Sequence, residues 1–232
     1  MFSTFYHELT KKTVVAFGTL FNNIFIERRD SNGQEQQKIK IPLTYAAKEK
    51  FMQRLSINLN DPSAYAAQII LPAMSFQMVN IIYDKERKKN SIQKRYAQDL
   101  EITDDIVINY HYADVPYNIN FQLSLYSRNI DDGLQIMEQI LPFFTPEFTI
   151  TIKPKVLKDE YEKIDIPIVL NEVKYTELFE GELVKENTRF LTWDFIFTAK
   201  TYMYGPVRQT GLIKNIDINI FDKFPEDYEW YQ

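Results

Sequence analysis

Residues 117–127 read YNINFQLSLYS, where four polar side chains alternate with four apolar ones: Asn118, Asn120, Gln122 and Ser124 against Ile119, Phe121, Leu123 and Leu125. Successive side chains of a strand point to opposite faces of a sheet, so this period of two predicts a strand with one apolar and one polar face. The apolar face covers a core and the polar face meets water or a partner, as is typical of antiparallel sheets. We expect residues 105–112 to form the strand that pairs with it.

Outward from this strand, the periodicity predicts about eight strands and three helices. Apolar residues at spacings of three and four predict helices over 4–17, 46–59 and 130–141. We expect Gly18 to cap the first helix at its C-terminus and Asn129 to cap the third at its N-terminus. Further strands are predicted over 21–27, 38–41, 74–83, 148–153, 164–178, 190–204 and 212–221.

These elements predict the fold class α+β: a mostly antiparallel sheet flanked by about three helices, with a long β-hairpin. The 232 residues, 45% of them hydrophobic, suit a single domain over 1–232. From this domain a hairpin over 21–43 is expected to project, and residues 84–104 are expected to form a loop.

The hairpin has a polar tip. Asn32-Gly33 is a strong signal for a tight turn between strands, and residues 27–37 hold almost nothing apolar. The tip either lies in water or meets a polar surface of a neighbouring subunit or partner protein. The residues predicted to make that contact are Arg28, Arg29, Asp30, Asn32 and Gly33.

One basic cluster stands against the formal net charge of −5. It lies in 84–95, and its candidate contact residues are Lys85, Arg87, Lys88 and Lys89. Such a run is a solvated loop in most proteins, and the functional alternative is contact with an acidic protein surface. The overall charge gives no case for sequence-specific binding of nucleic acid.

The C-terminal stretch 212–221 also alternates, and its candidate contact residues are Ile216, Ile218 and Ile220. A terminal strand of this kind docks on its own sheet or pairs with an extended arm of another chain. Both arrangements stay open at this point.

Several kinds of chemistry are excluded by what the chain lacks. It has no Cys, and its six Gly fit neither a Walker A loop nor a dinucleotide fingerprint. Its two His cannot build a His-rich metal site, and no apolar run is long enough to span a membrane. We therefore expect no enzymatic activity, no cofactor and no metal. The alternative is an enzyme or ligand-binding domain whose site forms only in three dimensions.

Six phrases, taken in order, carry a resemblance to a known family: 17–24 (FGTLFNNI), 42–46 (PLTYA), 71–76 (LPAMSF), 131–144 (DDGLQIMEQILPFF), 148–154 (FTITIKP) and 204–207 (YGPV). They resemble the tail sheath stabiliser and completion protein, or tail terminator, of T-even-type contractile-tailed bacteriophages. The match fails within 84–103 and after Val207, so 84–104 is expected to be a variable loop.

The resemblance implies a fold similar to phage tail terminators and a structural role in the virion. Such proteins form a hexameric ring at the head-proximal end of the tail, terminate the tube and sheath, and stabilise the extended sheath. The implied partners are the tail sheath protein, a tail tube or tube-capping protein, and neck or connector proteins, with genome DNA able to pass through the ring. The implied location is the neck region of the virion tail, after assembly in the host cytoplasm. Another neck or connector component is the nearest alternative.

Overall fold

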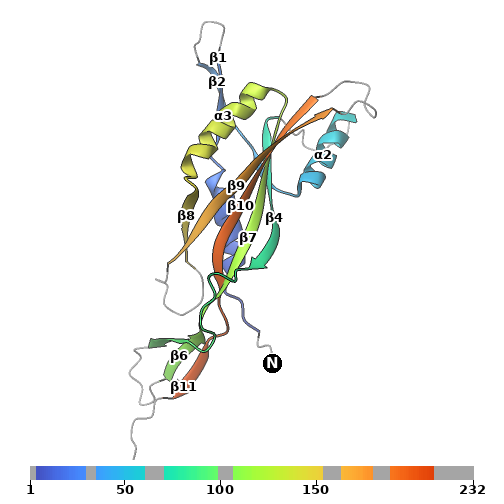
Figure 1. Cartoon of the computed structure of the whole chain (residues 1–232). Helices are drawn as coiled ribbons and strands as arrows, with labels where there is room; N and C mark the ends of the chain where they lie inside the picture. Colours follow the sequence, from blue (N-terminus) through green and yellow to red (C-terminus); the bar gives the residue numbers. More distant parts are fainter. Residues whose placement is uncertain are drawn as a thin grey trace, which may run out of the picture.

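The computed structural model describes residues 4–29, 35–60, 71–98, 107–153, 163–179 and 189–211 (Figure 1). The described helices are α1 (Leu9–Leu20), α2 (Lys48–Asn60), α3 (Ile130–Ile140) and the short 3-10 helix η1 (Leu141–Phe143). The described strands are β1 (Phe25–Arg29), β2 (Glu35–Lys40), β3 (Leu43–Tyr45), β4 (Ala73–Tyr83), β5 (Lys94–Gln98), β6 (Val107–Tyr112), β7 (Val115–Ser127), β8 (Glu147–Ile152), β9 (Ile164–Phe179), β10 (Arg189–Met203) and β11 (Arg208–Gly211).

A six-stranded sheet in the order β3-β4-β7-β10-β9-β8 forms the main body. All its pairs are antiparallel except β3 with β4. β7 lies beside β4 and β10, and Phe121 pairs with Met78 on one side and Phe197 on the other. The predicted α+β class is confirmed, as is the predicted strand over 117–127. The predicted pairing of residues 105–112 with that strand is wrong, because β6 pairs with β5 and β11 instead.

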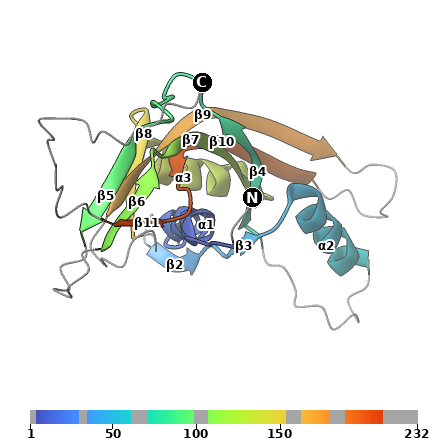
Figure 2. The ribbon, with the colours of Figure 1, turned by 90° about the horizontal axis from the view of Figure 1, so that it is seen from below.

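Helices α1 and α3 cover one face of this sheet, and Figure 2 shows the sheet curving over them. The row Ile119, Phe121, Leu123 and Leu125 points at this face and is fully buried. Phe17 of α1 stacks on Phe121 with ring centroids 4.3 Å apart. The alternation of β7 therefore points its apolar row at the helices, as expected for a sheet covered on one side.

Helix α2 packs on the opposite face at one end of the sheet. Phe51 stacks on Tyr126, whose side chain points away from α1 because it neighbours Leu125 in the strand. Burial raises the pKa of Tyr126 to about 12, and its phenol shares a 3.0 Å hydrogen bond with Ser75. Lys48 forms a 2.5 Å ion pair with Asp194 on the same face.

The two inner helices approach the sheet closely at glycines. Gly18 lies inside α1, which continues to Leu20, so the prediction that Gly18 caps the helix is wrong. A Cβ at Gly18 would overlap the ring of Phe76, and one at Gly133 of α3 would overlap the ring of Trp193. Asn129 also makes no capping bond through its side chain. Both glycines are required by the short distance between helix and sheet rather than by turn geometry.

A smaller sheet, β11-β6-β5, extends from the far end of the main body (Figure 1). In the chain, β11 follows β10, β6 precedes β7 and β5 follows β4. The order β11-β6-β5 therefore repeats the order β10-β7-β4 of the larger sheet. Part of the segment expected to be a loop over 84–104 is therefore strand β5. The predicted strand over 212–221 lies outside the described residues.

Replacing Gly133 by Ala tests the contact between α3 and the sheet. Alanine favours a helix by roughly 1 kcal/mol over glycine. Trp193 is only 3% exposed and its ring would overlap the added methyl group, so overpacking of typically about 1–3 kcal/mol should outweigh that gain. We expect a lower melting temperature for Gly133→Ala, measured by calorimetry.

Gly205→Ala is the matched control, because a Cβ at Gly205 meets nothing within 4 Å. Its stability should stay within about 0.5 kcal/mol of the wild type. Equal or higher stability of Gly133→Ala would contradict the close approach.

Candidate interaction surfaces

Two glutamines of α3 hold the hairpin strand β1 by its backbone. Gln139 Nε2 donates to the carbonyl of Phe25 at 2.7 Å, and Gln139 Oε1 accepts from the N–H of the same residue at 3.4 Å. Gln135 repeats this pattern with Glu27, accepting at 3.0 Å and donating at 3.2 Å. Each side-chain amide thus takes the place that a neighbouring strand residue would have on the edge of β1.

Asp132, one turn nearer the N-terminus of α3 than Gln135, also contacts β1. Its carboxylate lies 3.5 Å from the guanidinium of Arg28. Residues 132, 135 and 139 lie on one face of a helix because they are three and four positions apart. The hairpin is also anchored at its root, where Ile26 and Ile41 are fully buried.

This geometry places the predicted tip residues only in part. Arg28 binds α3 of its own chain, although its side chain remains 48% exposed. Arg29 ends β1, while Asp30, Asn32 and Gly33 lie outside the described residues. Figure 1 shows β1 and β2 extending beyond the end of α3. Contact of the tip with a partner stays a prediction.

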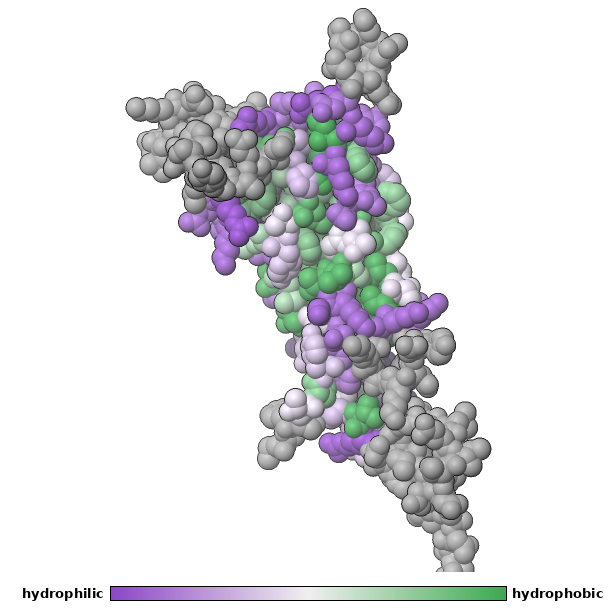
Figure 3. Space-filling model, turned by 180° about the vertical axis from the view of Figure 1, so that it is seen from behind, coloured by the Kyte–Doolittle hydropathy of each residue, from purple (hydrophilic) through white to green (hydrophobic). Residues whose placement is uncertain are grey.

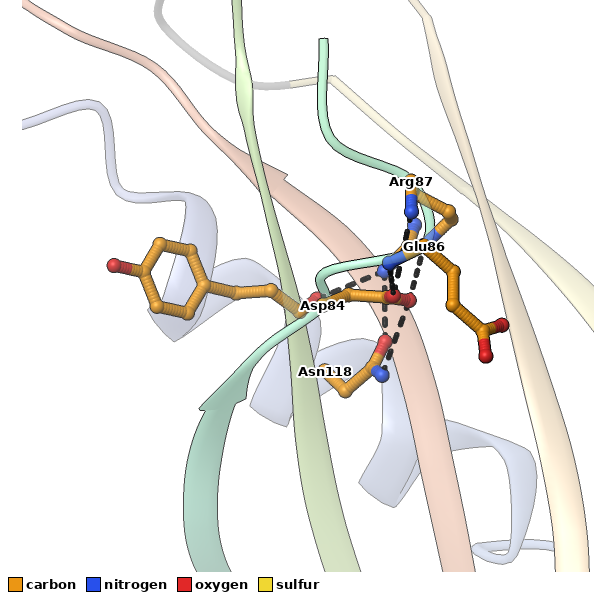
Figure 4. A network of polar contacts seen from close by, with 5 residues as sticks. Asp84, Glu86, Arg87 and Asn118 are labelled. Carbon is orange, nitrogen blue, oxygen red and sulfur yellow. Dashed lines mark hydrogen bonds and ion pairs between the residues drawn. The ribbon is translucent and has the colours of Figure 1, made fainter.

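The basic cluster lies where the main sheet meets the smaller sheet. Arg87 Nε donates to Asp84 Oδ2 at 2.7 Å, and its terminal nitrogen donates to Asn118 Oδ1 at 2.7 Å (Figure 4). Asn118 closes the network by donating to Asp84 Oδ2 at 3.2 Å. The Arg87 guanidinium holds the pKa of the Asp84 carboxyl below its usual range, although desolvation acts against it.

A second carboxylate binds the next part of the cluster. Asp114 is 3% exposed and accepts from Lys89 at 2.9 Å and from Arg95 at 3.2 Å. The Tyr202 ring of β10 lies 4.1 Å from Lys89 Nζ and 5.0 Å from the Arg87 guanidinium carbon. These cations join β4, β7 and β10 to the start of the smaller sheet.

The four predicted basic residues therefore separate into two pairs. Arg87 and Lys89 are half-buried and bind within the chain, whereas Lys85 and Lys88 are exposed. Contact with a partner was predicted for all four residues, but of these only Lys85 and Lys88 are exposed to solvent. The predicted residues Ile216, Ile218 and Ile220 lie outside the described part of the chain.

An apolar hollow of about 650 Å³ lies between the end of α1, the end of α3 and η1. Leu20, Ile24 and Phe144 line it, and Phe143 at its border is 64% exposed. Figure 3 shows apolar residues gathered across the middle of the face opposite to Figure 1, with hydrophilic ones toward the end that bears the hairpin.

Both histidines have structural positions. His7 Nε2 donates to the carbonyl of Gly205 at 2.9 Å, and His111 is 2% exposed beside Tyr204. Among the described residues, no group of three His, Asp or Glu side chains could hold a metal ion. No helix in that part of the chain is long and apolar enough to cross a membrane.

The contacts of Gln135 and Gln139 with β1 were not predicted from the sequence, nor were the ion pairs of Arg87 and Lys89 with Asp84 and Asp114. Gln135 and Gln139 stand four apart on a predicted helix, which places them on one face, but their partners are more than 100 residues away along the chain. Spacing gives the face of the helix, and only the fold gives the strand beside it.

Two comparisons relate this chain to known proteins. Residues 4–229 match the sequence profile of the T4-like virus Myoviridae tail sheath stabiliser. The chain is also similar to tail completion protein gp15 of Enterobacteria phage T4, with 33% identity over 219 residues. That alignment covers 92% of this chain and 77% of the phage T4 protein.

Replacing Gln135 by Glu tests whether α3 directs the hairpin. The substitution keeps an acceptor for the N–H of Glu27 but removes the donor to its carbonyl, at a cost of roughly 1 kcal/mol. We expect faster hydrogen exchange of the β1 amides with little change elsewhere. Glu138→Gln, an exposed change on the same helix, should leave exchange in β1 unchanged; equal protection in both variants would show that the glutamines do not hold the hairpin.

Replacing Asp84 by Asn tests the junction network through pH. Because the folded-state pKa of Asp84 is lowered, the network stabilises the fold above about pH 4, the usual pKa of Asp. This contribution is lost as the pH falls through the lowered pKa. The difference in melting temperature between wild type and Asp84→Asn should be largest at pH 7 and shrink below about pH 4.

The control for that series is Glu86→Gln, because Figure 4 shows the Glu86 side chain turned away from Asp84. Its melting temperature should follow the wild type through the titration. A difference for Asp84→Asn that stays the same from pH 7 down to well below about pH 4 would rule out ionisation of Asp84 as its source.

Proposed function

The chain belongs to the T4-like virus Myoviridae tail sheath stabiliser family, and we propose that it is a structural protein that completes and stabilises a contractile phage tail. The observation that carries this proposal is a family match over residues 4–229, which includes both sheets and the hairpin. The protein acts by contact, as a ring of six copies at the head-proximal end of the tail. There it terminates the tube and sheath and offers a surface to the neck.

The hairpin is the part of the fold best suited to reach a neighbour. A projecting hairpin positions a partner usefully only if its direction is constant. Three side chains of α3 hold β1 here, and Ile26 and Ile41 anchor its base in the core. The tip, from Arg29 through Gly33, is proposed to contact an adjacent subunit or a tail protein, with a rigid orientation that supports repeated identical contacts in a ring.

The exposed pair of lysines supplies a second contact. Lys85 and Lys88 stand at the end of the main sheet, while Arg87 and Lys89 beside them bind within the chain. The exposed pair meets an acidic surface of a tail sheath, tube or neck protein. Surface ion pairs of this kind are worth about 0–1 kcal/mol each and weaken with salt, so they orient partners more than they hold them.

A contact protein of this kind needs no catalytic machinery, cofactor or metal. Three buried carboxylates of the described residues make internal ion pairs, Asp132 with Arg28, Asp194 with Lys48 and Asp114 with Lys89. The proposed location is the neck region of the virion tail, with assembly in the host cytoplasm.

Electron microscopy of the purified protein bound to isolated tails tests this function. We expect six-fold rings at one end of each tail, because a ring that caps a six-fold tail must match its symmetry to make equivalent contacts. Gly205→Ala should bind as the wild type does, since the added methyl group meets nothing. Particles of five or seven subunits, or binding along the whole tail, would contradict the proposal.

A further inference from the structure

Two strands of the main sheet have open edges over much of their length. β3 covers β4 only along Met74–Phe76, which leaves residues 77–83 without a neighbour on that side among the described residues. β8 covers β9 along Ile164–Val169, and Leu170 still donates to the carbonyl of Pro146, which leaves residues 171–179 uncovered in the same part of the chain. Each edge presents backbone groups that another strand could pair with.

The two edges differ in charge. Residues 171–179 include Glu172, Lys174 and Glu177, and charged side chains on an edge discourage pairing with other chains. Residues 77–83 read QMVNIIY and include no charge. Val79, Ile81 and Ile82 are 53%, 42% and 50% exposed there. An uncharged, apolar edge invites aggregation unless a specific partner occupies it.

The backbone of this edge is available for hydrogen bonding. Asp84 N–H donates to the carbonyl of Pro116 in β7, so the backbone N–H and C=O groups of Asp84 and Ile82 face β7. In an antiparallel pair the alternate residues face the other way, so Ile81 and Tyr83 direct their N–H and C=O groups outward. Among the described residues, nothing pairs with those outward groups.

The polar face of the sheet ends at the same edge. Asn171 donates to Thr198, which donates to Asn120, which donates to Asn80, at 2.7, 2.8 and 2.7 Å. This row of hydrogen bonds crosses β9, β10, β7 and β4. Asn80 accepts in the last bond of the row, and its own amide N–H groups have no acceptor among the described residues.

We propose that the C-terminal segment 212–221 of a second copy of this chain adds as a strand to the 77–83 edge. The inference rests on the proposed ring. In the segment, Ile216, Ile218 and Ile220 alternate with Asp217 and Asn219. An extended strand of this pattern sets an isoleucine row beside Ile81 and Tyr83, and sets Asn219 on the face where Asn80 offers its amide.

The topology favours a neighbouring copy over the same chain. The last described residue, Gly211, ends β11, which continues β10 and stands at the end of the smaller sheet away from β5, whereas the open edge of β4 lies on the other side of β7 in the strand order. Donor segment and acceptor edge on opposite sides make a head-to-tail contact, which closes into a ring when each copy repeats it.

Cysteine cross-linking tests the contact, because the chain has no Cys of its own. Ile82→Cys and Asn219→Cys are made as separate full-length chains, mixed, and treated with a short bis-maleimide. Both positions belong to the outer face of the proposed pair, so a covalent dimer with one chain of each kind is expected. Glu172→Cys, on the charged edge, replaces Ile82→Cys in the control mixture and should give no dimer with Asn219→Cys.

Ile82→Lys is the second variant, because one charge on an edge blocks strand addition and this side chain is half exposed. We expect its melting temperature to be unchanged and its subunit association to be lost. Unimpaired association of Ile82→Lys would overturn the inference. So would an equal yield of dimer in the Glu172→Cys mixture, or a link within one chain in the Ile82→Cys/Asn219→Cys double variant.

The outcomes separate this inference from the proposed function. Six-fold rings on tails without cross-linked dimer overturn the strand addition and leave the function standing. Cross-linked dimer in particles of another symmetry supports the strand addition and overturns the six-fold ring. A chain that stays monomeric on tails overturns both.

Discussion

The close contact between the inner helices and the sheet is the constraint on which the rest of this structure depends. Phe17 is fully buried and stacks on Phe121, with the rings of Phe76 and Phe197 5.6 and 5.3 Å away. Glycine at position 18 allows α1 to press against Phe76. Losing a buried phenylalanine costs about 3–5 kcal/mol, so this cluster holds three central strands in one arrangement.

The packing of α3 against the sheet also fixes the position of a surface element, the hairpin strand β1. Gly133 lets α3 lie against Trp193, and the same helix then holds β1 through Gln135 and Gln139. The direction of the hairpin is therefore set by packing in the core. A hairpin carried on such a support can meet the same partner in the same way in every subunit, as the proposed ring would require.

The surfaces of the sheet differ according to what covers them. On the polar face, amides and hydroxyls bind one another across four strands, from Asn171 to Asn80. On the open edges, β9 carries charges and β4 carries none. The amides and hydroxyls of this row are bonded within the chain, whereas the outward backbone groups of β4 at 81 and 83 have no partner among the described residues. The junction between the main sheet and the smaller sheet is stabilised by two ion pairs, Asp84 with Arg87 and Asp114 with Lys89. Both cations belong to the basic cluster recognised in the sequence.

Local periodicity was enough to determine the main elements. The alternation in 117–127 marks the central strand and its buried row, and the spacing in 130–141 marks α3, because side-chain direction repeats every two residues in a strand and every 3.6 in a helix. The α+β class follows from these patterns. Composition acts at the same level, since a chain without Cys has neither disulfides nor thiolate chemistry whatever its fold.

Tertiary structure alone decided the roles of particular residues. The sequence pattern predicts Gly18 as a helix cap. In the structure Gly18 lies inside α1 and makes room for the ring of Phe76, which is 58 positions further along the chain. Arg87 and Lys89 share a basic run with Lys85 and Lys88, yet among the described residues only the first two pair with carboxylates of their own chain. Gln135 and Gln139 bind a strand 108 and 114 residues away. A sequence records spacing along the chain, whereas close approach, ion pairing and hydrogen bonding depend on distances in space that only the folded chain establishes.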